Sequence, residues 1–378
     1  MKLIYCIASV HHPGGMERVL LNKLCWFVRQ GGYDLTVVTT DQSGLPPFYA
    51  FPPEVKMIDL DVNYAIDNQR SPLAKIASYF RKRSLHRKRL TDLLLQARAD
   101  IVVSLYPSES SFIPRIKDGS KKVLELHYNK FFRLQYNRRG LLGLADRFRT
   151  WQDERIVRRF DQFVVLTHED AAYWGALPNL KVIPNAAIQT DTPQADTRNS
   201  RRVIAVGRLD YQKGFDRLID AWSLLPADLR ETWHLAIFGQ GEWQEKLTEQ
   251  IRHRHLEESV QIHPPTREIA QAYASSAFLA MSSHYEGFPM VMIEAMSCGL
   301  PVVTFDYPCG PKDIIRDGEN GLLVKEGDIE GLSQALGRMM TDEDLRIRLG
   351  KAARHVLDTY RENTIMQQWT QCFQKLLQ

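Results

Sequence analysis

The stretch SSHYEGFPMVMIEAMSCGLPVV, residues 282–303, decides the fold of this chain. An apolar run at 278–281 leads into it, and a loop that carries Glu286 and Gly287 follows. A helix is predicted to begin near Pro289, because proline is favoured in the first turn of a helix. A second apolar run, 301–305, comes shortly after that helix. Strand, loop, helix and strand in this order predict a βαβ unit and therefore a parallel sheet.

The same alternation runs through the whole chain. Further apolar strands are predicted at 3–10, 35–40, 101–104, 122–126, 163–166, 203–206, 234–238 and 322–324. Residues 189–201 lack apolar periodicity and are predicted to link two domains, at 1–188 and 202–362. We expect an α/β protein of two Rossmann-like domains with parallel sheets, facing each other across a cleft.

The composition is that of a globular protein, but its charge is unevenly distributed. The 378 residues are 44% apolar and 25% charged, with a formal net charge of +4. Residues 1–190 hold 28 Lys and Arg against 18 Asp and Glu, a balance of +10, whereas residues 191–378 hold 21 against 27, a balance of −6. This asymmetry predicts domains with different partners.

The cysteines and the hydropathy bear on the compartment. The five cysteines are scattered, odd in number and without a CxxC pair, which argues against a disulfide framework and a structural zinc site. No window of about 18 uncharged apolar residues occurs, so no bilayer-spanning segment is expected. These observations favour a cytoplasmic protein, with attachment to a membrane surface left open.

The loop and helix of the 282–303 stretch offer groups for a phosphorylated ligand. Gly287 allows close approach to the backbone, and the helix start at 288–291 presents free N–H groups to a phosphate. Glu294 can accept both hydroxyls of a ribose, as acidic residues do in dinucleotide sites. The alternative for Glu294 is an ordinary solvent-facing helix residue.

Two further loops follow strands, at the edge where open α/β sheets bind ligands. In GRLDYQKGF, residues 207–215, Arg208 and Lys213 could neutralise a pyrophosphate without a metal. An ordinary basic loop is the alternative. Gly14 and Gly15 allow a tight turn at a helix N-terminus, but they do not form GxGxxG, so dinucleotide binding has little support.

Together these motifs resemble retaining glycosyltransferase family 4, which has the GT-B fold. Glu286 to Glu294 matches the E-x7-E motif of that family, and residues 14–18, 182–185, 207–214 and 317–324 match in the family's order and spacing. The stretch CGPKDII at 309–315 is similar to members that build bacterial surface polysaccharides from UDP-sugars. The resemblance also implies a terminal helix, 363–378, that packs back on the first domain.

The resemblance implies a role for each candidate residue. Arg208 and Lys213 would hold the pyrophosphate and stabilise the leaving UDP, whose charge develops as the glycosidic bond breaks. Glu286 would lie near the donor sugar, and Glu294 would bind the ribose. The remaining implied contacts are the base (backbone of Thr266), sugar hydroxyls or phosphate (Gly287 and the backbone of Phe288, Pro289, Met290 and Val291) and the diphosphate (Gly14 and Gly15).

His127, at the end of LELH, occupies the position of a family histidine that meets the donor sugar. The resemblance implies that it orients the sugar or stabilises positive charge at the anomeric carbon. An ordinary histidine at a strand end is the alternative from the residues alone. The implied catalytic set is His127, Arg208, Lys213 and Glu286, with retention by front-face attack.

No cofactor and no metal are expected. Asp59-Leu60-Asp61 is a DxD triplet, which binds a divalent cation in another glycosyltransferase fold, but it ends an alternating stretch far from the nucleotide motifs. The pair His11-His12 has no cluster of metal ligands at a suitable spacing.

Residues 70–159 concentrate the positive charge, with 22 Lys and Arg against 8 Asp and Glu. Apolar residues are interleaved, among them Phe80, Phe148 and Trp151. Such a surface attracts anionic lipid and would suit a lipid-diphosphate acceptor. A solvated helix face is the alternative, and nucleic acid is disfavoured because no RRM, KH or helix-turn-helix pattern accompanies the charge.

The function expected is transfer of a hexose or N-acetylhexosamine from a UDP-sugar to a lipid-linked glycan, in the synthesis of capsule, lipopolysaccharide or a related surface glycan. The expected location is the inner face of the plasma membrane. The alternatives are a GDP- or ADP-sugar-dependent transferase, a nucleotide-sugar epimerase of the same fold, and a non-catalytic sugar- or membrane-binding subunit. The sequence leaves the donor sugar, acceptor, linkage and oligomeric state open.

Overall fold

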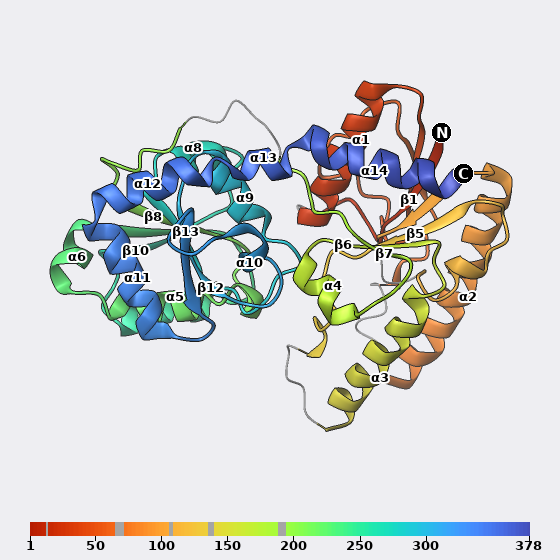
Figure 1. Cartoon of the computed structure of the whole chain (residues 1–378). Coiled ribbons are helices and arrows are strands. Elements are labelled where there is room, and N and C mark those ends of the chain that lie inside the picture. The colour runs from red at the N-terminus through yellow and green to blue at the C-terminus, as the bar shows by residue number, and fades with distance from the viewer. Residues whose placement is uncertain (13, 65–71, 106–108, 135–139, 188–193) are drawn as a thin grey trace. The chain divides into compact units, whose positions relative to one another are not determined.

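The chain forms two compact units (Figure 1). The computed structural model describes residues 1–12, 14–64, 72–105, 109–134, 140–187 and 194–378. Unit 1 contains Met1–Pro184 and Ile365–Gln378, and unit 2 contains Asn185–Thr364. Each unit is built on one sheet whose strand pairings are all parallel. The prediction of two Rossmann-like α/β domains is confirmed.

Unit 1 has a seven-stranded sheet in the order β3-β2-β1-β4-β5-β6-β7. Its strands are β1 (Lys2–Cys6), β2 (Asp34–Thr39), β3 (Lys56–Asp59), β4 (Ile101–Ser104), β5 (Lys121–Glu125), β6 (Gln162–Val165) and β7 (Leu180–Val182). Its α-helices are α1 (Gly15–Gln30), α2 (Pro72–Ala97), α3 (Gly140–Val157), α4 (His168–Trp174) and most of α14 (Glu362–Leu377). All four residues of β4 are buried, as expected for a central strand covered on both faces.

Unit 2 has a six-stranded sheet in the order β10-β9-β8-β11-β12-β13. Its strands are β8 (Arg202–Val206), β9 (His234–Phe238), β10 (Val260–His263), β11 (Phe278–Met281), β12 (Val302–Asp306) and β13 (Gly321–Lys325). Its helices are α5 (Phe215–Ser223), α6 (Ala227–Thr232), α7 (Gln244–His253), α8 (Ile269–Ala274), α9 (Met290–Ser297), α10 (Pro311–Ile314), α11 (Ile329–Thr341), α12 (Glu343–Ala353) and α13 (Val356–Tyr360). The neighbours β8 and β11 therefore bring the loops at 207–214 and 282–289 to one edge of this sheet.

The expected linker, 189–201, is described from residue 194, since residues 188–193 lie outside the described part of the chain. Residues 194–201 lie in unit 2 and bind it through their backbone. The N–H of Ala195 donates to the Cys298 carbonyl at 2.9 Å, and Arg346 Nε donates to the Thr197 carbonyl at 2.6 Å. Backbone hydrogen bonds need no apolar periodicity, so the sequence pattern carries no signal for this contact.

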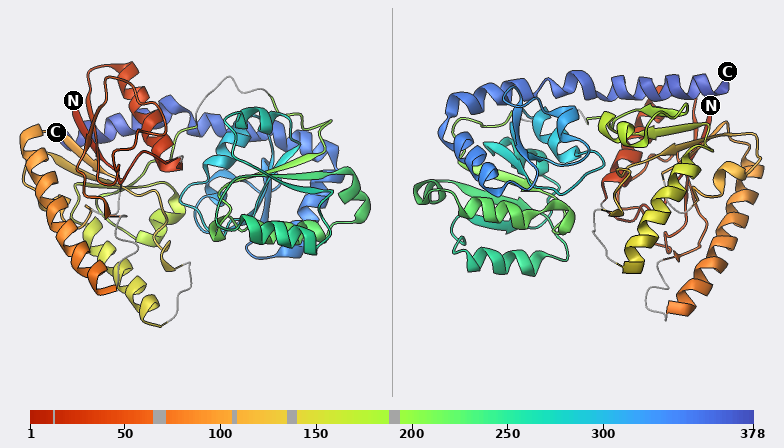
Figure 2. Two further views of the ribbon diagram at one scale, coloured as in Figure 1. Left: turned by 180° about the vertical axis from the view of Figure 1, so that it is seen from behind. Right: turned by 60° about the horizontal axis from the view of Figure 1, so that its bottom comes forward.

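The terminal helix α14 returns to unit 1, where it lies beside α1 (Figure 2). Trp369 and Phe373 are buried, and the ring centroids of Phe27 and Phe373 are 6.1 Å apart. Lys23 Nζ lies 3.8 Å from the centroid of the Trp369 ring, close enough for a cation–π interaction. An aromatic seam therefore joins the end of the chain to its first helix.

None of the described helices is long and apolar enough to cross a membrane.

We expect Trp369→Ala to destabilise unit 1 by about 3–5 kcal/mol, because it removes a fully buried aromatic ring and leaves a cavity. Leu377→Ala is the matched control on the same helix, since Leu377 is 43% exposed. The measurement is urea unfolding, together with amide hydrogen exchange of α1 and α14. Equal stability of the two variants would contradict a role of the seam in holding α14 on unit 1.

Candidate functional site

The loop after β8 is shaped by a capped 3-10 turn. Asp210 Oδ1 accepts a hydrogen bond from the Lys213 N–H at 3.2 Å, which starts the turn at Tyr211–Lys213. Gly214 ends it in the left-handed region, with φ 59°. A Cβ on Gly214 would lie 2.3 Å from the Ser282 carbonyl oxygen, so only glycine allows the loop after β8 to approach the loop after β11 this closely.

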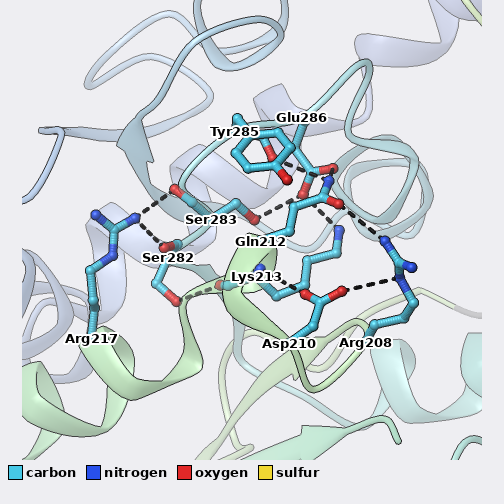
Figure 3. Close-up of polar contacts among 9 residues, drawn as sticks. All are labelled: Arg208, Asp210, Gln212, Lys213, Arg217, Ser282, Ser283, Tyr285 and Glu286. Atoms are coloured by element: carbon cyan, nitrogen blue, oxygen red, sulfur yellow. Dashed lines mark hydrogen bonds and ion pairs between the residues drawn. The ribbon is translucent and has the colours of Figure 1, made fainter. Parts of the chain in front are cut away.

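The carboxylate of Glu286 is the centre of the polar network between these loops (Figure 3). Its Oε1 accepts from Lys213 Nζ at 2.6 Å and from Ser283 Oγ at 2.8 Å, and its Oε2 accepts from Gln212 Nε2 at 3.1 Å. The side chain is 7% exposed and that of Lys213 is 14% exposed. Three donors therefore hold this carboxylate in one orientation at the edge of the sheet.

Arg208 lies at the exposed rim of the same network. Its Nη2 donates to Gln212 Oε1 at 3.1 Å, and its Nε lies 3.4 Å from Asp210 Oδ2. The side chain is 72% exposed, so a phosphate could bind the guanidinium with a small desolvation penalty. The structure thus brings together Arg208, Lys213 and Glu286, three residues that the sequence predicts to share a site.

The other predicted residues of unit 2 are held separately from that network. Glu294, on α9, is half-buried, and its Oε2 accepts from the Tyr273 hydroxyl at 3.3 Å. It is therefore not simply a solvent-facing residue. Thr266 is exposed after β10, and its Oγ1 accepts from the Glu268 N–H at 3.0 Å.

The 287–291 segment leads into α9. Phe288 is buried, and its ring packs edge-on against Tyr360 with centroids 5.5 Å apart. The Met290 N–H donates to the Phe288 carbonyl at 2.9 Å. Pro289 lies 2.4 Å from the position that a Cβ of Gly310 would occupy, so the loop after β12 supports this turn. Gly287 and Val291 flank these contacts in the chain.

Sequence reasoning missed several supporting residues. Gln212 bridges Arg208 and Glu286, and Ser283 adds a donor to the carboxylate. The imidazole of His284 stacks on Tyr211 with centroids 4.1 Å apart, and burial lowers the pKa of His284. All three stand inside the quoted motifs. Gln212 reaches Glu286, and His284 reaches Tyr211, across about 70 positions of the chain, so only the fold identifies these two contacts, whereas Ser283 lies three residues from Glu286.

Unit 1 presents the glycine pair and His127. Gly14 caps the N-terminus of α1, and a Cβ there would lie 2.0 Å from Glu17 Oε2. A Cβ on Gly15 would meet no atom of the described residues within 4 Å, so the backbone there is open to a ligand. His127 follows β5, and its Nε2 lies 3.2 Å from Glu125 Oε1.

A buried ion pair stands behind His127. Lys23 Nζ donates to both oxygens of Glu125 at 2.6 and 2.7 Å, and the two side chains are 5% and 1% exposed. Burial raises the pKa of Glu125, but Lys23 and His127 outweigh burial and hold this pKa at about 2. Glu125 is therefore an ionised acceptor that orients the His127 ring.

Among the residues that the structure describes, no group of three or more His, Cys, Asp or Glu could hold a metal ion. The DxD triplet has a local structural contact instead. Asp59 ends β3, and its Oδ1 accepts a hydrogen bond from Thr39 Oγ1 of β2 at 3.0 Å.

Two family models cover nearly the whole chain. The model described as Glycosyltransferase Family 4 matches residues 13–187, and the model described as Glycosyl transferases group 1 matches residues 189–356. The boundary between them lies within a few residues of the boundary between units 1 and 2.

Curated relatives match over full length. The amylovoran biosynthesis glycosyltransferase AmsD of Erwinia amylovora is 30% identical over 97% of this chain and 98% of its own length. An α-1,4-N-acetyl-D-galactosaminyltransferase of Campylobacter jejuni, named for a glycan on diNAcBac-PP-undecaprenol, is 24% identical over 98% of this chain and 97% of its own length.

Solved structures share the fold. A crystal structure of TarM superposes with a TM-score of 0.81 at 15% identity, covering 98% of each chain. WaaG, a glycosyltransferase involved in lipopolysaccharide biosynthesis, superposes with a TM-score of 0.75 at 20% identity, covering 98% of this chain and 99% of its own.

We expect Lys23→Met and Glu125→Gln each to destabilise unit 1 by about 3–5 kcal/mol, because each substitution leaves the other buried charge without its partner. The double variant should lose less than the sum of the two, because it leaves neither charge unpaired. The measurement is urea unfolding at pH 7. The control is Lys56→Met, which removes an exposed pair with Asp34 and should cost less than about 1 kcal/mol.

The same pair predicts a pH dependence. The pKa of Glu125 is about 2 when folded, below its ordinary 4.5, so its stabilisation is complete above pH 4.5 and is lost as the pH falls towards 2. Glu125→Gln should flatten the stability curve in that window. Two results would contradict this account of the pair. One is a double variant whose loss of unfolding free energy equals the sum of the two single losses, and the other is a Glu125→Gln variant whose stability falls between pH 4.5 and 2 as steeply as that of the unmodified chain.

Proposed function

The chain belongs to the glycosyltransferases of family 4 and group 1, which have the GT-B fold, and on this basis we propose the reaction, donor and acceptor that follow. It transfers a hexose or N-acetylhexosamine from a UDP-sugar, with retention, to a lipid-linked glycan in surface-polysaccharide synthesis. The glycosyltransferase activity and the family agree with the interpretation of the sequence. The arrangement of Arg208, Lys213 and Glu286 in one network carries the proposal.

The network suits departure of a nucleoside diphosphate. Breaking the bond from the anomeric carbon to the diphosphate oxygen leaves negative charge on UDP, and a fixed cation stabilises that charge without reorganisation. Lys213 is fixed by Glu286 and by the capped turn. Arg208 is exposed and supplies the second cation. Two cations can take the part that a metal plays elsewhere, which supports a metal-independent reaction.

The state of Glu286 supports retention without a carboxylate nucleophile. Both of its oxygens accept hydrogen bonds, from Lys213, Ser283 and Gln212, and these bonds lower the nucleophilicity of the carboxylate. In the front-face reaction, the leaving diphosphate accepts the proton of the acceptor hydroxyl as that oxygen bonds to the anomeric carbon. Glu286 then orients the donor sugar, Glu294 binds the ribose, and the backbone near Thr266 meets the base.

His127 is the unit 1 residue that we assign to the donor sugar. Its ring is oriented by an ionised carboxylate, which favours any positive charge that develops nearby. Gly14 and Gly15 contribute backbone at the diphosphate. Both assignments follow from membership of the family.

The acceptor and the location rest on the relatives and on charge. The Campylobacter relative is named for an undecaprenol-linked glycan, and AmsD for the biosynthesis of amylovoran. Residues 70–159 carry a balance of +14, which suits both a lipid diphosphate and the anionic inner face of the plasma membrane. A cytoplasmic enzyme that binds peripherally to the plasma membrane would contact both the lipid diphosphate and the anionic membrane surface.

Incubation with UDP-, GDP- and ADP-sugars, with and without a polyprenyl-diphosphate-linked glycan, tests the reaction. We expect transfer from a UDP-sugar, an α-linked product by NMR, and unchanged rates in EDTA. Conversion of the UDP-sugar without acceptor would identify an epimerase instead. Nucleotide binding without any turnover would indicate a non-catalytic subunit.

Lys213→Ala should weaken UDP binding by about 10- to 100-fold, the size of a lost hydrogen bond to a charged group. The measurement is titration calorimetry with UDP. Lys351→Ala is the matched control, because Lys351 is an exposed lysine of unit 2 on α12. If Lys213→Ala binds UDP as tightly as the unmodified chain, the pyrophosphate assignment is wrong.

A further inference from the structure

Unit 1 contains a cavity of about 320 Å³ whose lining is rich in arginine. The α2 helix contributes Arg83, the segment around the 3-10 turn Ile113–Arg115 contributes Ser111 and Arg115, and α3 contributes Trp151 and Arg155. Arg159, just beyond α3, completes the set of four guanidinium groups. None of the lining residues is acidic.

The acidic residues nearby are occupied elsewhere. Asp153 pairs with Arg133, and Glu154 pairs with Lys130 at 2.7 Å. Among the described residues, no carboxylate pairs with Arg83, Arg115, Arg155 or Arg159. Four like charges around one cavity repel each other, so an anion there would relieve the repulsion as well as form direct hydrogen bonds.

Two of the guanidinium groups are already oriented by neighbours. Arg83 Nη2 donates to Ser111 Oγ at 2.8 Å, and the Arg155 guanidinium carbon lies 3.8 Å from the centroid of the Trp151 ring. Stacked or bridged arginines lose less rotamer freedom when they bind a phosphate. A volume of about 320 Å³ lies at the small end of ligand sites and accommodates a diphosphate.

An apolar stripe leads along α3 to this cavity. Leu144, Phe148, Trp151 and Arg155 are spaced four, three and four apart, which places them on one face of the helix. The first three are 62%, 55% and 44% exposed, and the rings of Phe148 and Trp151 are stacked with centroids 5.6 Å apart. Figure 1 shows α2 and α3 as the long helices at the lower edge of unit 1. Exposed large apolar side chains in a row indicate a contact with another apolar surface.

We propose that the arginine cavity binds the diphosphate of the acceptor lipid and that the stripe of Leu144, Phe148 and Trp151 contacts its hydrocarbon chain. The proposal rests on the proposed lipid-linked acceptor and names where that acceptor is held. An anionic head joined to an apolar tail matches a cavity of cations joined to an apolar row. Neither half alone points to an amphiphile, but their continuity along one helix face matches one.

The test is calorimetric titration of the full chain with farnesyl diphosphate, a soluble diphosphate with a short hydrocarbon chain. Arg83→Gln/Arg155→Gln should weaken binding by about tenfold or more, as expected for lost charge-assisted hydrogen bonds. The matched control is Arg147→Gln/Arg149→Gln, which removes the same charge from exposed positions of α3 outside the cavity. Equal losses in both double variants would overturn the cavity assignment in favour of diffuse charge.

Two further binding measurements identify whether the anion belongs to a lipid diphosphate, a free phosphate or a membrane headgroup. Leu144→Gln/Phe148→Gln should weaken farnesyl diphosphate but leave inorganic pyrophosphate unchanged. If pyrophosphate binds as tightly as farnesyl diphosphate to the unmodified chain, the ligand is a free anion and the lipid assignment fails. If Arg83→Gln/Arg155→Gln reduces binding to phosphatidylglycerol vesicles but not to farnesyl diphosphate, the cavity binds a membrane headgroup instead.

These binding assays separate this proposal from the proposed reaction. UDP affinity, measured on the same samples, should be unchanged in every cavity variant, because none of the cavity residues is assigned to the nucleotide sugar. Loss of UDP binding in the cavity variants would contradict the assignment. If the chain binds farnesyl diphosphate but transfers no sugar, the proposed reaction is wrong, and the proposed function of the cavity is unaffected.

Discussion

The contact between Lys213 and Glu286 is the constraint on which the polar network of unit 2 depends. It joins the loops that follow β8 and β11, which are neighbours in the sheet of unit 2 although about 70 residues separate them in the chain. Carboxyl ends of parallel strands meet at one edge, so the fold delivers both loops to the same place. Gly214 then lets the two backbones touch at Ser282, and Gln212 and Ser283 complete the coordination of the carboxylate. Unlike an isolated surface pair, this one is mostly buried and saturated with donors.

Unit 1 uses a second buried Lys–Glu pair for a different purpose. Lys23 of α1 meets Glu125 at the end of β5, and Trp369 of α14 stacks on the lysine. A buried pair of this kind is weak evidence for added stability, because desolvation offsets much of its Coulomb attraction. Its structural consequence is clearer: it gives His127 an ionised partner, and it ties the first helix, the central sheet and the last helix together.

The positive charge of the first half is not spread evenly over its surface. Several cations of residues 70–159 are neutralised locally, such as Lys130 by Glu154 and Arg133 by Asp153. Four arginines remain around one cavity between α2 and α3, and the exposed apolar side chains of α3 lie beside it. Ion pairs therefore cancel the positive charge at some places in unit 1, and the charge that is not cancelled includes the four arginines around the cavity.

The sequence by itself determined the two parallel α/β units, the terminal helix that returns to unit 1, and the membership of Arg208, Lys213 and Glu286 in one site. The two α/β units follow from apolar periodicity, whereas the returning terminal helix and the shared site follow from the resemblance of the motifs to the family. Only the tertiary structure decided that Gln212 and Ser283 hold Glu286, that Lys23 lies behind Glu125 and His127, and that four arginines share a cavity. Apart from Ser283 with Glu286 and Glu125 with His127, those contacts join residues far apart in the chain, and side-chain pairing across such separations leaves no periodic pattern in the sequence.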